Sequence, residues 1–226
     1  MRGCCCGYRT GFGRSPQTLK QYVQYGCGLS APPGWLNFDV SPSLVFQRFP
    51  LVGRWFCGFG PAFPKEVRFG DIVGGLPLEP GSCDGIYCSH VLEHLSFDDA
   101  LLAIEHTFSY LRCGGRFRMV LPDLEHLARV YLESEEISGA NNFMQNSGLG
   151  QQKRARSLPD FFREWLGNSR HRWMWDYKSL GEVLSQAGFS EIRRAESGDS
   201  KDERFRDVEE GSRWKDCLGI ECMRLA

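Results

Sequence analysis

The chain has 226 residues, 42% of them hydrophobic, and a formal net charge of −1. This length and apolar content predict one large domain with a substantial core. The near-zero charge argues against a nucleic-acid-binding domain, which would be strongly basic. No apolar run approaches the roughly 20 residues of a membrane-spanning helix. We therefore expect a cytoplasmic protein that neither spans a membrane nor binds nucleic acid.

The N-terminal region is basic and contains no acidic residue before Asp39. Such a bias is found in organelle transit peptides, but the amphipathic helical pattern of those peptides is missing here. We therefore expect residues 1–19 to form a loose N-terminal tail and residues 20–226 to form the domain. The basic residues concerned are Arg2, Arg9, Arg14 and Lys20.

Ten cysteines raise the question of disulfides or a structural metal. Cys4, Cys5 and Cys6 are adjacent, the others are scattered singly, and no two form a C-x-x-C pair. The usual frameworks of structural zinc sites are therefore absent. Most of the cysteines are expected to be reduced thiols that act as small hydrophobic residues.

Short β-prone runs alternate with helical patterns along the first half of the chain. The first run stops at Gly26-Cys27-Gly28, the second contains Asp39 at its end, and the third ends around Asp71. The fourth run leads directly into the segment that starts at His90. The five expected strands of this half cover residues 21–25, 35–40, 66–72, 84–89 and 116–121.

Three helices are expected. Ser96 and Asp99 form a pair that resembles a capping box, and the helix after them is predicted to end at Gly114-Gly115 because glycine favours the left-handed position beyond a helix. A second helix follows Pro122-Asp123, and a third runs from an Asp176 cap to Gly188. The apolar stripe of the first helix consists of Leu101, Ile104, Phe108 and Leu111.

The later part of the chain is less regular. Residues 134–172 interrupt the alternation, and we expect them to form a cover over the functional site that selects its substrate, the alternative being an ordinary helical decoration. Residues 199–210 are expected to be an exposed loop. Two further β-like runs cover residues 190–195 and 217–225.

Alternating strands and helices predict an α/β domain with a mainly parallel sheet and helices on both faces. Ligands of such sheets bind at the carboxyl ends of the strands. Asp39 could accept hydrogen bonds from both hydroxyls of a ribose, and Asp71 from an adenine amine, with Ile72 packed on the ring. Either aspartate alone is more simply a turn or cap residue, but three strand-end features in chain order indicate a nucleotide site.

Four segments together resemble the class I S-adenosylmethionine-dependent methyltransferases, in particular methyltransferases of type 11. They are residues 21–39, residues 83–95 with the sequence CDGIYCSHVLEHL, residues 111–123 with LRCGGRFRMVLPD, and residues 175–189. The resemblance implies a Rossmann-like, seven-stranded, mainly parallel sheet whose last strand is antiparallel. It also implies S-adenosylmethionine as the cofactor and a small-molecule or glycan-type acceptor.

The resemblance also assigns residues to the cofactor. Two positions depart from the family pattern: Gln24 replaces an acid that helps to hold the ammonium group, and Ser30 replaces a third glycine. If these changes have weakened the site, a non-catalytic nucleotide-binding module is the alternative function. An oxygen acceptor would need a base, for which His90 and His171 are the candidates. The expected cofactor-binding residues are Gly26, Cys27, Gly28, Asp39, Asp71, Ile72, Ser89 and His90.

A rival interpretation comes from His90-Val-Leu-Glu-His94, which matches the H-x-x-E-H motif of inverted zinc peptidases. His90 and His94 would bind zinc, Glu93 would be the general base, and Glu164 could be a third ligand. That motif needs one continuous helix, whereas His90 directly follows an expected strand. We therefore expect no metal. For Trp173 and Trp175, burial in a loop and a place in a substrate-facing wall are both open.

Overall fold

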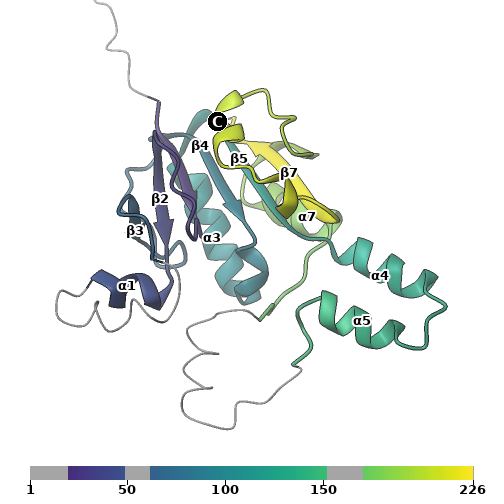
Figure 1. Cartoon of the computed structure of the whole chain (residues 1–226). Helices are drawn as coiled ribbons and strands as arrows, with labels where there is room; N and C mark the ends of the chain where they lie inside the picture. The colour runs from purple at the N-terminus through teal and green to yellow at the C-terminus, as the bar shows by residue number, and fades with distance from the viewer. Residues whose placement is uncertain (1–19, 49–61, 152–169, 226) are drawn as a thin grey trace, which may run out of the picture.

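The computed structural model describes residues 20–48, 62–151 and 170–225. Its centre is a seven-stranded sheet with the order β3-β2-β1-β4-β5-β7-β6 (Figure 1). The first five strands are parallel to one another, and β7 is antiparallel to both β5 and β6. The strands are β1 (Tyr22–Tyr25), β2 (Trp35–Asp39), β3 (Val67–Phe69), β4 (Cys83–Ser89), β5 (Leu111–Pro122), β6 (Ser190–Arg194) and β7 (Cys217–Met223).

The predicted Rossmann-like sheet of seven strands, with the last strand antiparallel, is confirmed. The third strand is shorter than predicted because the chain turns at Gly70, whose amide donates to the Asp39 carbonyl at 3.1 Å. A Cβ at Gly70 would lie 2.7 Å from the Phe38 ring, so this turn packs directly on β2. Asp71 therefore lies beyond β3 rather than at its last residue.

The helix before β5 begins as predicted but ends earlier. In α3 (Phe97–Tyr110), the Ser96 hydroxyl accepts a hydrogen bond from the Asp99 amide at 3.2 Å. The predicted end at Gly114-Gly115 is wrong, because the chain is already extended from Leu111 and both glycines lie within β5. A Cβ at Gly115 would lie 2.9 Å from the Cys83 carbonyl oxygen of β4. Glycine is needed there for close strand approach, not for ending the helix.

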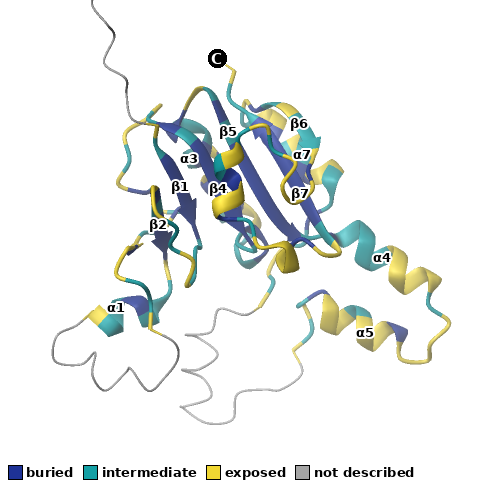
Figure 2. Cartoon of the chain, turned by 45° about the horizontal axis from the view of Figure 1, so that its top comes forward, coloured by how far each residue is buried: buried dark blue, intermediate teal, exposed yellow. Residues whose placement is uncertain are grey.

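One face of the sheet is covered by α3 and α7 (Tyr177–Gln186), which bury Ile104, Leu180 and Leu184 in the main core. The prediction of helices on both faces is only half right for the described residues. There the second face is packed by the segment that carries two 3-10 turns, η2 (Glu203–Asp207) and η3 (Gly211–Arg213). Figure 2 shows the buried strands between these layers.

The prediction that residues 199–210 form an exposed loop holds for most of them but not for Phe205, which is fully buried, or Val208, which is 8% exposed. Both pack against Tyr22 and Trp35 on the second face of the sheet. The apolar pair within a strongly charged sequence therefore fixes this segment to the sheet.

The remaining helices lie at the edges of the sheet. α1 (Pro42–Arg48) follows β2, while α4 (Leu124–Glu133) and α5 (Gly139–Asn146) form a hairpin that projects from the end of β5 (Figure 1). α4 has no fully buried side chain, and Tyr131 packs on Phe143 of α5 with ring centroids 5.6 Å apart. None of the helices in the described ranges is long and apolar enough to cross a membrane.

Six cysteines lie in the described part of the chain, and all six are free thiols. Cys83, Cys88 and Cys222 are buried in the core, as expected for small hydrophobic residues. Burial raises the pKa of Cys88 to about 12 and that of Cys222 well above its ordinary value. Cys113 is exposed.

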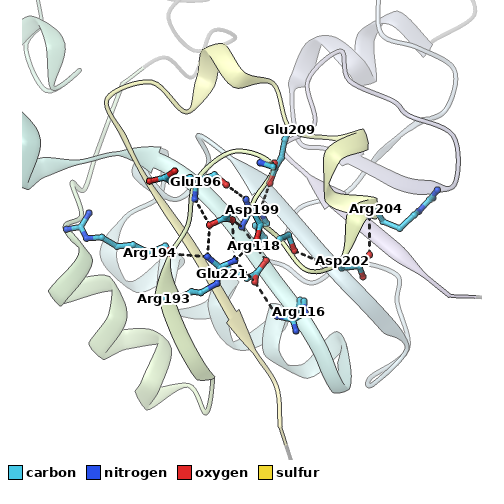
Figure 3. A network of polar contacts seen from close by, with 12 residues as sticks. Arg116, Arg118, Arg193, Arg194, Glu196, Asp199, Asp202, Arg204, Glu209 and Glu221 are labelled. Carbon is cyan, nitrogen blue, oxygen red and sulfur yellow. Dashed lines mark hydrogen bonds and ion pairs between the residues drawn. The ribbon is translucent and has the colours of Figure 1, made fainter.

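A buried cation joins β5 to the segment that covers the second face (Figure 3). Arg118 is fully buried, and its guanidinium contacts Glu209, lies 2.9 Å from Asp199 and 3.3 Å from Glu221 of β7, and stacks over Trp214. Three carboxylates thus surround one arginine, which is the pairing that a buried charge requires.

Asp199, at the outer side of this cluster, predicts a pH dependence of stability. Partial burial would raise the pKa of Asp199, but hydrogen bonds from Arg193, the Glu196 amide and Arg118 outweigh it and lower the pKa from 3.8 to about 2. The ionised carboxylate therefore contributes stability that is present above pH 4 and is lost as the pH falls toward 2. We expect the difference in unfolding free energy between wild type and Asp199→Asn to shrink between pH 5 and pH 3. A difference that is constant over that range, measured by urea titration, would contradict this assignment.

Candidate functional site

A cavity of about 190 Å³ lies at the carboxyl ends of β1, β2 and β4, beside the turn after β3. This volume is below the range of about 300–1,000 Å³ that is typical of small-molecule sites. The structure brings Gly26, Asp39, Asp71, Ile72 and His90 together there, as the sequence predicts. The full lining is Tyr25, Gly26, Asp39, Val40, Ser41, Gly70, Asp71, Ile72, His90, Val91, His94 and Leu95.

The turn after β1 needs glycine for two reasons. Gly26 has a φ of +64°, and a Cβ there would lie 2.2 Å from Cγ2 of Val91. Gly28 has a φ of +54° but no atom within 4 Å of its Cβ position. Cys27, between them, donates its amide to the Phe38 carbonyl at 3.1 Å and does not line the cavity.

These two glycines form a matched pair for substitution. Gly28→Ala should lower the unfolding free energy by about 1–2 kcal/mol, the cost of a left-handed conformation for an L-residue. Gly26→Ala carries the same cost and also displaces Val91, so it should be clearly less stable and should reshape the cavity. Urea unfolding of both variants measures the difference. Equal losses would show that the contact with Val91 is unimportant.

Asp39 is a buried carboxylate at the end of β2, with only 5% of its surface exposed. Its Oδ2 accepts from the Gly28 amide at 2.8 Å, and its Oδ1 accepts from the Ser41 amide at 2.7 Å. Each carboxylate oxygen has a second lone pair. Asp39 is therefore held rigidly toward the cavity and can still accept two hydroxyl donors of a ligand.

The adjacent part of the cavity combines an exposed acid with apolar walls. Asp71 Oδ1 accepts from the Val73 amide at 2.9 Å, and within the described part of the chain no hydrogen bond reaches Oδ2. Ile72 is 5% exposed, and Val91 and Leu95 line the cavity with it. A flat heteroaromatic ring with an amino group would fit the apolar side chains and this carboxylate.

Of the two residues expected beside the cofactor after β4, only His90 lines the cavity. The Ser89 hydroxyl instead accepts from Arg213 Nε at 2.7 Å, on the side of the second sheet face. The predicted place of Ser89 beside the cofactor stays a prediction, and its side chain is engaged by Arg213 instead of lining the cavity. η3 brings Arg213 against the end of β4.

His90 is held in a left-handed conformation, with a φ of +53°, and both ring nitrogens are occupied. Nδ1 lies 3.1 Å from Glu93 Oε1, and Nε2 lies 3.0 Å from the Arg213 carbonyl oxygen. Burial would lower the pKa of His90, but hydrogen bonds with Cys217, Glu93 and the Arg213 carbonyl outweigh it and raise the pKa to about 10. Both ring nitrogens of His90 therefore have protein partners, an arrangement that does not favour His90 as a general base; that role stays a prediction.

His171, the other candidate base, does not line the cavity. Its ring packs edge-on against His94 with centroids 4.9 Å apart, and its Nδ1 lies 2.6 Å from the Ser147 carbonyl oxygen. His94 itself lines the cavity. A direct role of His171 as a base is therefore not favoured by its position.

The zinc peptidase interpretation fails on geometry. β4 ends at Ser89, and η1 (Leu92–His94) is a three-residue 3-10 turn rather than a continuous helix. His90 has no free ring nitrogen for a metal. Glu164 lies outside the described residues.

The structure also gives a role to Gln24, which stands where the family pattern has an acid. Its side chain is 3% exposed and does not line the cavity, and its Nε2 donates to the Ser30 carbonyl at 2.9 Å and to Asn37 Oδ1 at 2.7 Å. Gln24 therefore ties β1 to β2 and to the connecting turn. Val91, His94 and Leu95 also line the cavity but were not predicted from the sequence, although residues just after β4 are expected at this end of the sheet.

No family model matches the chain, and a search of curated proteins finds no match. Among solved structures it is similar to an SAM-dependent methyltransferase from Thermotoga maritima (15% identity, TM-score 0.49, 90% of this chain and 82% of that one). It is also similar to an SAM-dependent methyltransferase from Archaeoglobus fulgidus (15% identity, TM-score 0.47, 90% of this chain and 86% of that one). A third similar structure is PigF with SAH (15% identity, TM-score 0.47, 91% of this chain and 56% of that one). The chain therefore spans little more than half the length of PigF. At these identities and TM-scores, the likeness carries no argument about function.

Proposed function

We propose that the chain is an S-adenosylmethionine-dependent methyltransferase. The observation that supports this most is the buried carboxylate of Asp39, fixed by two backbone amides at the end of β2 and facing a cavity beside the Gly26 turn. Carboxylates at this position of a parallel sheet commonly hold a ribose. The apolar side chains next to Asp71 supply a place for an adenine.

Each residue then has a role in holding the cofactor. Asp39 accepts the two ribose hydroxyls, Ile72 and Val91 pack on the adenine, and Asp71 accepts from its amine. Gly26, which lacks a Cβ, leaves room for the methionyl part. When bound, S-adenosylmethionine supplies an electrophilic methyl group, and the contribution of the protein is to position the two reactants and exclude water.

For the acceptor we propose a small molecule or a glycan-type compound, bound next to the cofactor in a cytoplasmic enzyme. The segment 134–172 is the proposed cover that selects it. In support, the described end of this region lies against η1: the amides of Arg172 and Trp173 donate to the Glu93 carbonyl at 2.7 and 3.3 Å. The projecting α4–α5 hairpin fits a helical decoration better, so the selective part of the cover would be the part near residue 172.

Calorimetric titration with S-adenosylhomocysteine tests the cofactor assignment. Asp39→Ala removes a charged acceptor, which should cost about 1.5–3 kcal/mol, a loss of roughly 10- to 150-fold in affinity. The matched control is Asp176→Ala, which removes the aspartate cap of α7 and should lower stability but leave affinity unchanged. An unchanged affinity in folded Asp39→Ala would exclude the proposed site.

The alternative function is a non-catalytic nucleotide-binding module, favoured by the use of Gln24 as a structural link where the family pattern has an acid for the ammonium group. Such a module should bind ATP or NAD about as well as S-adenosylhomocysteine. Competition titrations with these nucleotides distinguish the two functions.

A further inference from the structure

Three potential metal ligands outside the proposed nucleotide contacts lie together next to the cavity. Glu93 and His94 come from η1, and His171 comes from the segment before β6. One ligand atom from each lies within 4.8 Å of the other two. Two imidazoles and one carboxylate are a ligand set that protein zinc sites use.

The two imidazoles are already oriented as metal ligands usually are. His94 Nδ1 lies 3.0 Å from the Arg170 carbonyl oxygen, and His171 Nδ1 lies 2.6 Å from the Ser147 carbonyl oxygen. Because a carbonyl oxygen can only accept, each Nδ1 carries the proton and each Nε2 keeps its lone pair in the neutral ring. Metal-binding histidines almost always donate their other ring N–H to such an outer partner.

Glu93 gives a second, independent indication. Glu93 is fully buried, and its Oε2 has no hydrogen-bond or ion-pair partner among the described residues. Oε1 lies 3.1 Å from His90 Nδ1 and 4.0 Å from His94 Nε2. A buried carboxylate is unfavourable unless its oxygen atoms are paired. The contact with His90 accounts for Oε1 and leaves Oε2 unsatisfied.

We propose that Glu93, His94 and His171 bind one divalent transition-metal ion, with zinc as the best match to two imidazoles and a carboxylate. Zinc bonds of about 2.0–2.1 Å place tetrahedral ligands about 3.4 Å apart, so binding needs only a small closure of the three side chains. The set differs from the H-x-x-E-H pairing, because His171 takes the place of His90. Since His94 also lines the cavity, the open coordination position would adjoin the nucleotide site.

Zinc titration of the chelator-treated full chain tests this site, with calorimetry and the visible spectrum of the cobalt-substituted protein as readouts. We expect one ion per chain and absorption bands of a tetrahedral cobalt site. His171→Ala and Glu93→Gln should each weaken binding at least 10-fold. His126→Ala, a histidine of α4 outside the cluster, should leave binding unchanged.

If the variant at the fully buried Glu93 does not fold, His171→Ala still tests the site, because His171 is only half-buried. Absence of stoichiometric zinc, or equal affinity in wild type and His171→Ala, would overturn the site. The inference goes beyond the proposed function and does not rest on it: zinc binding without S-adenosylhomocysteine binding would refute the methyltransferase and leave the metal site standing.

Discussion

Arg118→Leu should lower the free energy of unfolding by about 3–5 kcal/mol, the usual effect of removing one member of a buried ion pair. Glu221 would keep Arg116 and Arg193 as partners, at 3.2 and 2.9 Å. Glu209, whose side chain is 3% exposed, would keep only the Gly198 amide as a partner among the described residues. The loss thus comes from leaving one carboxylate buried and poorly compensated. Urea unfolding followed by circular dichroism measures it.

Arg112→Leu is the matched control, because Arg112 pairs with Asp84 at 2.7 Å but is 49% exposed. Exposed pairs contribute about 0–1 kcal/mol. Replacing Arg118 and Glu209 together by leucines should recover much of the loss, since no unpaired charge is then left behind. Equal stability of the Arg118 and Arg112 variants would show that the cluster is not a buried charge site.

Trp175→Ala should lower the unfolding free energy by a similar amount, about 3–5 kcal/mol, as is usual for a buried tryptophan. Trp175 is 1% exposed, stacks on Phe97 of α3 at 5.7 Å, and accepts the Leu124 amide on its carbonyl at 2.9 Å. It thus fixes the chain after His171 to the start of α4. Thermal and urea unfolding both report the loss.

Trp173→Ala is the control for this prediction. Trp173 also contacts Phe97, at 4.8 Å, but is 44% exposed, and its loss should change stability by only about 0.5 kcal/mol. Trp175→Phe should be milder than Trp175→Ala, because the indole N–H has no partner within the described structure. Similar losses for Trp173→Ala and Trp175→Ala would contradict the anchoring role.

The sequence predicted most of the sheet because buried parallel strands appear as short apolar runs separated by helical patterns. It misplaced the end of α3 because two glycines that permit close strand approach have the same local signature as a helix stop. It also could not predict the packing of residues 199–214 on the second face. The pairing of Arg118 with carboxylates about 80 to 100 positions away is a tertiary effect without a local pattern.

For the site, the glycine turn and both aspartates were predictable because each lies at or just beyond the end of a strand, and parallel strands align their carboxyl ends. The raised pKa of His90 was not predictable, since it depends on Arg213 and Cys217, which are distant in sequence. The position of His171 near Glu93 was not predictable for the same reason. The H-x-x-E-H motif pairs only His90 and His94, whereas folding also brings His171 close to Glu93 and His94.

The difference in burial among the cysteines allows the opening of the native structure to be followed by their reactivity. Thiolates react with alkylating reagents and thiols do not, so Cys88 and Cys222, buried and with raised pKa values, should be protected in the native state. Cys113, exposed at the start of β5, should react at once. Mass spectrometry of timed alkylation therefore gives the rate at which the centre of the sheet becomes accessible, without any introduced label.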